Sequence, residues 1–149
     1  MRYVILGVPE DIGIRANMGR GGADEAWQAF LQFFCNKPSN DFFTGGNALL
    51  LGHVILDDLL AESKHLHNEN PTDLQRLREL CAEVDVRVYP IIRAIAYAGL
   101  EPIVIGGGHN NCFPVIAGVN DGLREAEIIE RDGINVVTVS YTHLTLPTN

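Results

Sequence analysis

Short apolar runs alternate with longer amphipathic or polar stretches along this chain. Residues 3–7 (YVILG) are a continuous apolar run that is closed by Gly7 and Pro9, the pattern of a strand buried on both faces. Similar runs predict strands at residues 48–51, 102–105 and 134–139, and residues 102–105 are predicted to be a clearly buried strand. Strands that are buried on both faces are typical of a parallel sheet.

A long amphipathic helix is predicted between residues 71 and 99, because apolar positions recur there at spacings of three and four. They are Leu74, Leu77, Cys81, Val84, Val88, Ile91, Ile92, Ile95 and Ala98. Pro71 is tolerated in a first turn, and Thr72 and Gln75 have the spacing of a capping box. Pro90 lacks the N–H that a helix interior uses and costs ~3 kcal/mol there, so we expect a kink or a break.

Two shorter helices are predicted at residues 27–34 and 113–122, each after a glycine-rich segment. The first such segment, residues 10–26, has neither helical nor strand periodicity, and we expect it to be a loop. Residues 62–71 are polar and end in proline, which predicts a surface loop. The succession of helix, strand, turn and helix is the βαβ rhythm of an α/β fold.

The composition narrows the choice of partners and compartment. The length of 149 residues suits one ordinary domain, and a net charge of -8 disfavours binding to nucleic acid or to an anionic membrane surface. The apolar start is too short for a signal peptide. Cys35, Cys81 and Cys112 form no Cys-x-x-Cys pair, so we expect a reduced, cytoplasmic chain without a disulfide framework or a thiolate zinc site.

The strongest candidate for chemistry is His109, which follows Gly106, Gly107 and Gly108 directly after a predicted strand. Ligands of open α/β sheets bind at the carboxyl ends of the strands, and glycines allow another group to approach closely. His109 is therefore well placed as a metal ligand or an acid/base. The alternative is that the glycines only make a turn and that His109 bonds locally.

Several other residues have both a functional and a structural interpretation. The amides of Asn17 and Asn111, with Arg20 and Asn110, could orient a substrate, and turn formation explains them equally well. His65 and His67 lie in a polar stretch without patterned carboxylates, which favours a surface loop. Cys112 could be a nucleophile, but no third, orienting group is evident.

The segments GVPEDIGIRANMGRGGADEA and IVIGGGHNN together resemble the ureohydrolase family of arginases, agmatinases and formimidoylglutamases. The first is similar to that family's Gly-Val/Ile-Pro-x-Asp loop with its following Gly-x-x-Gly-Ala, here Gly7, Pro9, Asp11, Gly19, Gly22 and Ala23. The second is similar to the Gly-Gly-x-His motif whose histidine binds metal, here His109. Gly108 stands where arginases and agmatinases usually carry Asp, which favours the formimidoylglutamase-like branch.

This resemblance implies a three-layer αβα fold with a mainly parallel, arginase-like sheet and hydrolysis of a carbon–nitrogen bond in a small amidine or guanidino substrate. Two Mn²⁺ ions would activate the attacking water, and His109 would be one of their ligands. Asn17 and Asn111 would be the substrate-binding residues. A homo-oligomer of the full-length protein is compatible with this interpretation.

The chain departs from the family pattern after residue 137. The family's next motif is Asp-x-His-x-Asp, whereas this sequence continues TVSYTHLTLPTN and has no acidic residue after Asp132. His143 lacks the flanking carboxylates of a substitute ligand. The Thr-rich tail resembles translated adapter sequence. We therefore expect residues 1–137 to be the N-terminal part of a catalytic domain, residues 138–149 to be non-native, and the chain as given to be inactive.

An alternative from another class is a noncatalytic α/β module that binds a phosphate or a nucleotide at the glycine-rich loops. A dinucleotide fingerprint fits less well, because GGGHNNC lacks the third small residue of Gly-x-Gly-x-x-Gly/Ala.

Overall fold

A three-stranded parallel sheet lies at the centre of the structure, a computed structural model that describes residues 1–130 and 133–137. The strand order is β2 (Ala48–His53), β1 (Tyr3–Gly7), β3 (Glu101–Ile105). The central strand β1 is buried along most of its length, which explains its unbroken apolar sequence. The predictions of an α/β chain, of a parallel sheet and of these strands are confirmed.

All three strands end at the same edge of the sheet. Gly7 is in register with His53 on one side and with Ile105 on the other. The glycine-rich segments that follow β1 and β3 therefore leave the sheet side by side, and the backbone N–H of Val8 donates to the carbonyl of Ile105 at 2.9 Å.

Residues 102–105 form the predicted strand, but the prediction that this strand is buried is wrong. Ile103 is 39% exposed, because β3 is an edge strand of the described sheet and no described strand covers its outer side. Residues 134–137 are not part of a strand, contrary to expectation. The rest of that predicted strand and the predicted non-native tail, residues 138–149, lie outside the described residues.

Helix α4 (Pro71–Tyr97) is the longest element, and it buries Leu77, Val84, Val88 and Ile92 completely. Pro90 does not break it: the helix is continuous through this exposed proline, whose apolar neighbours at positions 88 and 92 remain packed.

The start of α4 differs from the predicted capping box. The N-cap is Asn70, whose side chain accepts the backbone N–H groups of Thr72 at 2.9 Å and Asp73 at 3.4 Å. Pro71 follows at the first helical position, where a missing N–H has no consequence.

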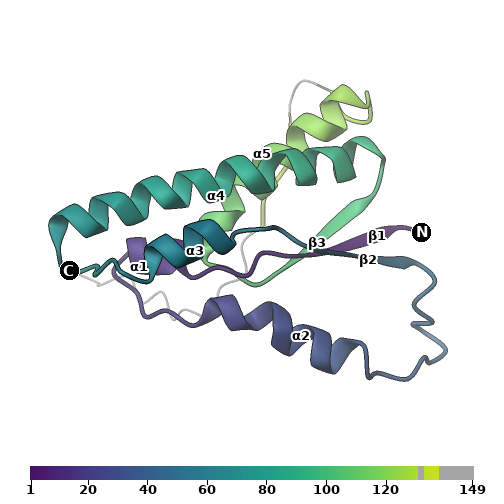
Figure 1. Ribbon diagram of the computed structural model, residues 1–149. Coiled ribbons are helices and arrows are strands. Elements are labelled where there is room, and N and C mark those ends of the chain that lie inside the picture. The colour runs from purple at the N-terminus through teal and green to yellow at the C-terminus, as the bar shows by residue number, and fades with distance from the viewer. Residues whose placement is uncertain (131–132, 138–149) are drawn as a thin grey trace, which may run out of the picture.

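Helices lie on both faces of the sheet (Figure 1). Helix α2 (Ala26–Phe34) covers one face, where Trp27 packs against Gly7. Helices α3 (Asp57–Ser63), α4 and α5 (Cys112–Glu125) lie on the other face. Helices α2 and α5 confirm predictions, whereas α1 (Ile12–Ala16) was expected to be loop.

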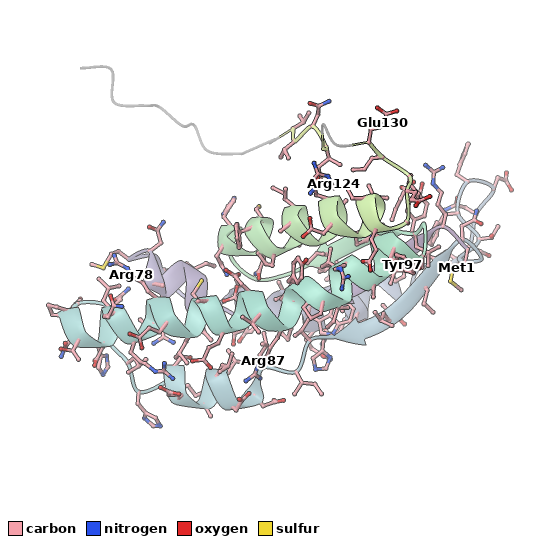
Figure 2. All side chains as sticks on the ribbon, turned by 90° about the horizontal axis from the view of Figure 1, so that it is seen from above. Met1, Arg78, Arg87, Tyr97, Arg124 and Glu130 are labelled. Atoms are coloured by element: carbon pink, nitrogen blue, oxygen red, sulfur yellow. The ribbon has the colours of Figure 1, made fainter. Side chains whose placement is uncertain are left out.

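Viewed from above, α3 and α5 lie along opposite sides of α4 (Figure 2). Arg87 of α4 makes two bonds of 2.6 Å to the carboxylate of Asp58 on α3. On the α5 side, Gly118 and Gly122 let the backbones of α4 and α5 approach closely, since a Cβ on either would crowd Arg93 of α4. Across residues 1–130 and 133–137, no helix has both the length and the apolar character needed to cross a membrane.

Candidate functional site

The candidate site lies where the segments after β1 and β3 meet. After β1 the chain passes through Glu10 into the short helix α1. After β3 it passes through the three glycines into a single 3-10 turn, η2 (His109–Asn111), and then into α5. Helix α1 contacts η2, so both predicted motifs contribute to one place in the fold.

Glu10 joins the two segments. Its side chain is fully buried and its carboxyl group accepts four N–H groups. Oε2 accepts the backbone N–H of Gly13 at 3.0 Å, and Oε1 accepts that of Gly108 at 2.8 Å. Oε1 also accepts the side-chain amides of Asn111 at 2.7 Å and Asn110 at 3.3 Å. These four N–H donors use much of the accepting capacity of a carboxylate side chain.

The glycines are required by this close approach. Gly106 and Gly107 have φ values of +92° and +77°, in the left-handed region that other residues rarely adopt. A Cβ on Gly107 would lie 2.9 Å from Glu10 Oε1, and a Cβ on Gly108 would lie 2.9 Å from Ile14 Cγ1. The expectation that these glycines admit another group is confirmed, and the group is Glu10 together with α1.

A pocket of about 430 Å³ opens beside this junction and is lined by Gly13, Ile14, Asn17, His109 and Asn110. His109 is exposed at the start of η2, and Asn17 is exposed at the C-cap of α1. The structure thus brings together two of the predicted site residues, His109 and Asn17, from motifs far apart in the sequence.

Asn111, the second predicted substrate-binding residue, does not line this pocket. It is 5% exposed, and its amide donates to Glu10 and, at 3.3 Å, to the carbonyl of Gly108. Its neighbour Asn110 lines the pocket instead. Asn111 therefore bonds Glu10 to the turn that bears His109, while its contact with a substrate stays a prediction.

Among the side chains that line the pocket, His109 is the one of a type that commonly binds metal. In residues 1–130 and 133–137, no three His, Cys, Asp or Glu side chains gather where they could hold a metal ion. Both oxygens of Glu10 are already engaged by N–H groups. This donor set does not complete a site for Mn²⁺.

The remaining histidines lie elsewhere. His65 and His67 are exposed between α3 and α4, where the backbone N–H of His67 donates to Asp73 at 3.0 Å, as a surface loop predicts. His53 is exposed at the end of β2, with its ring 6.5 Å from that of Trp27. His143 lies outside the described residues.

The pKa values of two side chains on α4, Cys81 and Asp85, are raised by burial and by the nearby carboxylate of Glu10. Burial, followed by repulsion from Asp85 and from Glu10, raises the pKa of the Cys81 thiol to about 11. Burial and then repulsion from Glu10 also raise the pKa of Asp85. Asp85 Oδ1 is buried and has no hydrogen-bond partner within the described part of the chain. Burial and the neighbouring negative charges therefore favour the neutral forms of Cys81 and Asp85.

Sequence reasoning did not identify Glu10 or Asp85. A signal for Glu10 was present, because it closely follows the end of a strand, as His109 does. Asp85 had no comparable signal, since it lies within the regular polar pattern of α4.

The fold and the site define an α/β chain with a histidine-bearing pocket at the carboxyl edge of a parallel sheet. A comparison with protein-family models, curated proteins and solved structures finds no match for this chain. The resemblance to ureohydrolases accordingly stays a prediction.

Proposed function

We propose that this chain carries one metal ligand and part of the substrate pocket of a binuclear Mn²⁺-dependent hydrolase of linear amidines or guanidines. A formimidoylglutamase-like substrate is preferred over an arginase-like or agmatinase-like one, and an arginase-like αβα fold is part of the same proposal. One observation carries it: His109 and Asn17, from the two motifs that suggested this chemistry, line a single pocket at the edge where α/β sheets bind ligands.

The chemistry explains why a histidine is needed there. Resonance makes the central carbon of an amidine or guanidine a poor electrophile, so water must be deprotonated and held in line with it. Paired Mn²⁺ ions supply that activation when bound, and imidazole is a suitable ligand. Within the proposal, His109 anchors one ion and Asn17 presents its amide to the substrate. One ligand cannot hold two ions, so we propose that the chain by itself is inactive.

The alternative of a phosphate-binding or nucleotide-binding module has less support. A phosphate at a glycine-rich turn is held by free backbone N–H groups. Here the N–H groups of Gly13 and Gly108 already donate to Glu10, which would also repel an anion. The net charge of -8 acts in the same direction.

The proposal includes a small-molecule substrate, a reducing cytoplasmic setting, and neither nucleic acid nor membrane as a partner. Cys35, Cys81 and Cys112 are all unpaired, which supports a reducing compartment.

The first test is the reading frame beyond the codon for Val137. We expect Asp-x-His-x-Asp to follow; a native frame that truly ends in SYTHLTLPTN would overturn the proposal.

The second test is activity of the protein made from that complete frame and loaded with Mn²⁺. Release of ammonia, formamide or urea from formimidoylglutamate, agmatine and arginine would be measured. We expect hydrolysis of one of them and a loss of at least roughly 100-fold in His109→Ala, in line with the importance of metal ligands and their supports. His65→Ala, an exposed histidine outside the pocket, is the matched control and should retain activity. Absence of hydrolysis with all three compounds would contradict the proposal.

A further inference from the structure

Glu10 is buried, and no cationic side chain among the described residues pairs with it. Within that part of the chain its carboxylate accepts N–H groups alone, two from the backbone and two from asparagine side chains. Removing a carboxylate from water is costly unless hydrogen bonds replace its solvation. An apolar side chain would fill the same space at a lower cost, so packing alone does not explain a glutamate here.

The donors come from both walls of the pocket. Gly13 belongs to α1, and the carbonyl of Gly13 in turn accepts the backbone N–H of Asn17 at 3.2 Å. Gly108 and Asn110 are the residues immediately before and after His109. A single carboxylate is therefore bonded to both neighbours of His109 and to the helix that carries Asn17.

We propose that Glu10 is a positioning residue, an internal anion that fixes the turn bearing His109 against the helix bearing Asn17. Within residues 1–130 and 133–137 the exposed ring of His109 has no hydrogen-bond partner, so its position depends on the backbone on either side of it. Part of this inference, the benefit to metal and substrate binding, rests on the proposed function. The fixing of the two segments does not.

The two carboxylate oxygens of Glu10 have different hydrogen-bond partners, so a variant that replaces one of them separates their effects. Oε1 accepts all three donors from the His109 turn, whereas Oε2 accepts only the N–H of Gly13. In Glu10→Gln, the remaining carbonyl oxygen can still accept the N–H groups of the turn that bears His109. The new NH₂ group would face the N–H of Gly13, and two donors cannot form a hydrogen bond. In Glu10→Ala both links are lost, and the vacated space has the size and the donors to accept a formate ion.

The experiment is amide hydrogen exchange by NMR on the full chain and its variants. In Glu10→Ala, we expect the amides of Gly13 and Gly108 to exchange roughly tenfold to a hundredfold faster, because hydrogen bonds to charged groups are among the stronger ones. Amides of the central strand β1 should not change. Sodium formate should restore the protection of both glycines, whereas sodium chloride at the same ionic strength should not.

Glu10→Gln keeps the size of the side chain and serves as a second variant in case Glu10→Ala does not fold. In Glu10→Gln the amide of Gly13 should exchange faster than in the parent chain, whereas the amide of Gly108 should keep most of its protection from exchange. The matched control is Asp11→Asn, which alters the adjacent carboxylate, whose Oδ2 accepts the N–H of Gly22 at 3.2 Å. It should leave Gly13 and Gly108 unchanged. Unaltered glycine exchange in Glu10→Gln, or equal restoration of Glu10→Ala by chloride, would overturn the inference.

A second measurement separates this inference from the proposed function. Mn²⁺ added to the protein made from the complete reading frame should broaden the His109 ring signals, and Glu10→Ala in that protein should need more Mn²⁺ for the same broadening unless formate is present. If the glycine amides respond as described and Mn²⁺ does not bind in any variant, the positioning role stands and the proposed function fails.

Discussion

The carboxamide of Asn110 occupies the space that a Cβ on Gly13 would need. Helix α1 and the turn after β3 are in contact at this point, and the contact is possible only with glycine at position 13. Because Gly13 also donates its N–H to Glu10, one residue carries both the steric and the polar part of the junction.

We predict that Gly13→Ala destabilises the chain by about 1–3 kcal/mol, the usual cost of inserting a methyl group into a tightly packed place. The sign is informative, because alanine normally stabilises a helix relative to glycine. Gly46→Ala is the control: it has open space, with only Thr44 nearby at 3.7 Å, and should change stability by less than about 0.5 kcal/mol. Urea unfolding of both variants measures the difference, and a stabilised Gly13→Ala would contradict the packing described.

Arg15 connects α1 to the end of α3. Its guanidinium donates to the carbonyls of Ser63 at 2.7 Å and Leu66 at 2.6 Å, and its side chain is mostly buried. Lysine cannot reproduce this forked geometry. We expect Arg15→Lys to lose about 1.5–3 kcal/mol in urea unfolding, the range for hydrogen bonds to charged groups. The exposed Arg20 provides the control, and an equal loss in Arg20→Lys would show that the contacts of Arg15 are not responsible.

Asp85 makes stability depend on pH. Its pKa is raised above the ordinary 3.8, first by burial and then by repulsion from Glu10. The native chain therefore binds more protons than the unfolded chain just above pH 3.8, and stability falls as pH rises through the native pKa.

We accordingly expect Asp85→Asn to have a higher Tm than the parent at pH 7 and to lose this advantage when the pH falls below about 3.8, where Asp85 is protonated in both states. Asp41→Asn, in the exposed loop between α2 and β2, should show no such gain. A pH-independent effect of Asp85→Asn would mean that its charge is not the cause.

The three cysteines should differ in reactivity. Cys35 and Cys112 are exposed, whereas Cys81 is partly buried with a pKa raised to about 11. Only the thiolate reacts with iodoacetamide, so Cys81 should be alkylated last at pH 8. Mass spectrometry of timed samples would show the order, and Glu10→Gln should speed the reaction of Cys81 by removing a nearby negative charge. Early labelling of Cys81 in the parent chain would contradict the burial and charge assigned to it.

The parts of the fold that could be predicted are those set by local pattern. The central strand β1 is apolar throughout because both of its faces are covered, and α4 has a clear helical period. The exposure of Ile103 could not be predicted, because it depends on whether another strand lies beside β3. The five residues of α1 are too few to show a period.

The candidate site was predictable only in part. His109 and Asn17 could be selected because they follow or accompany glycines, and the structure places them on one pocket. Glu10 was not predicted as a site residue because a glutamate is rarely buried. Its burial depends on partners up to 101 residues away in the sequence. At Pro90 the sequence showed the local free-energy cost of a proline in a helix. It did not show that the packing of neighbouring residues keeps α4 continuous.

The most direct test of the central claim is a Mn²⁺ titration of the protein made from the complete reading frame that the proposed function requires, followed by NMR of the histidine rings. Paramagnetic broadening reports which imidazole lies nearest to the bound ion. The account predicts that the signals of His109 broaden first, that the exposed His65 and His67 broaden only at higher Mn²⁺, and that His109→Ala abolishes the early phase. Equal broadening of all the histidines, or broadening that begins at His65 and His67, would contradict the assignment of His109 as a metal ligand.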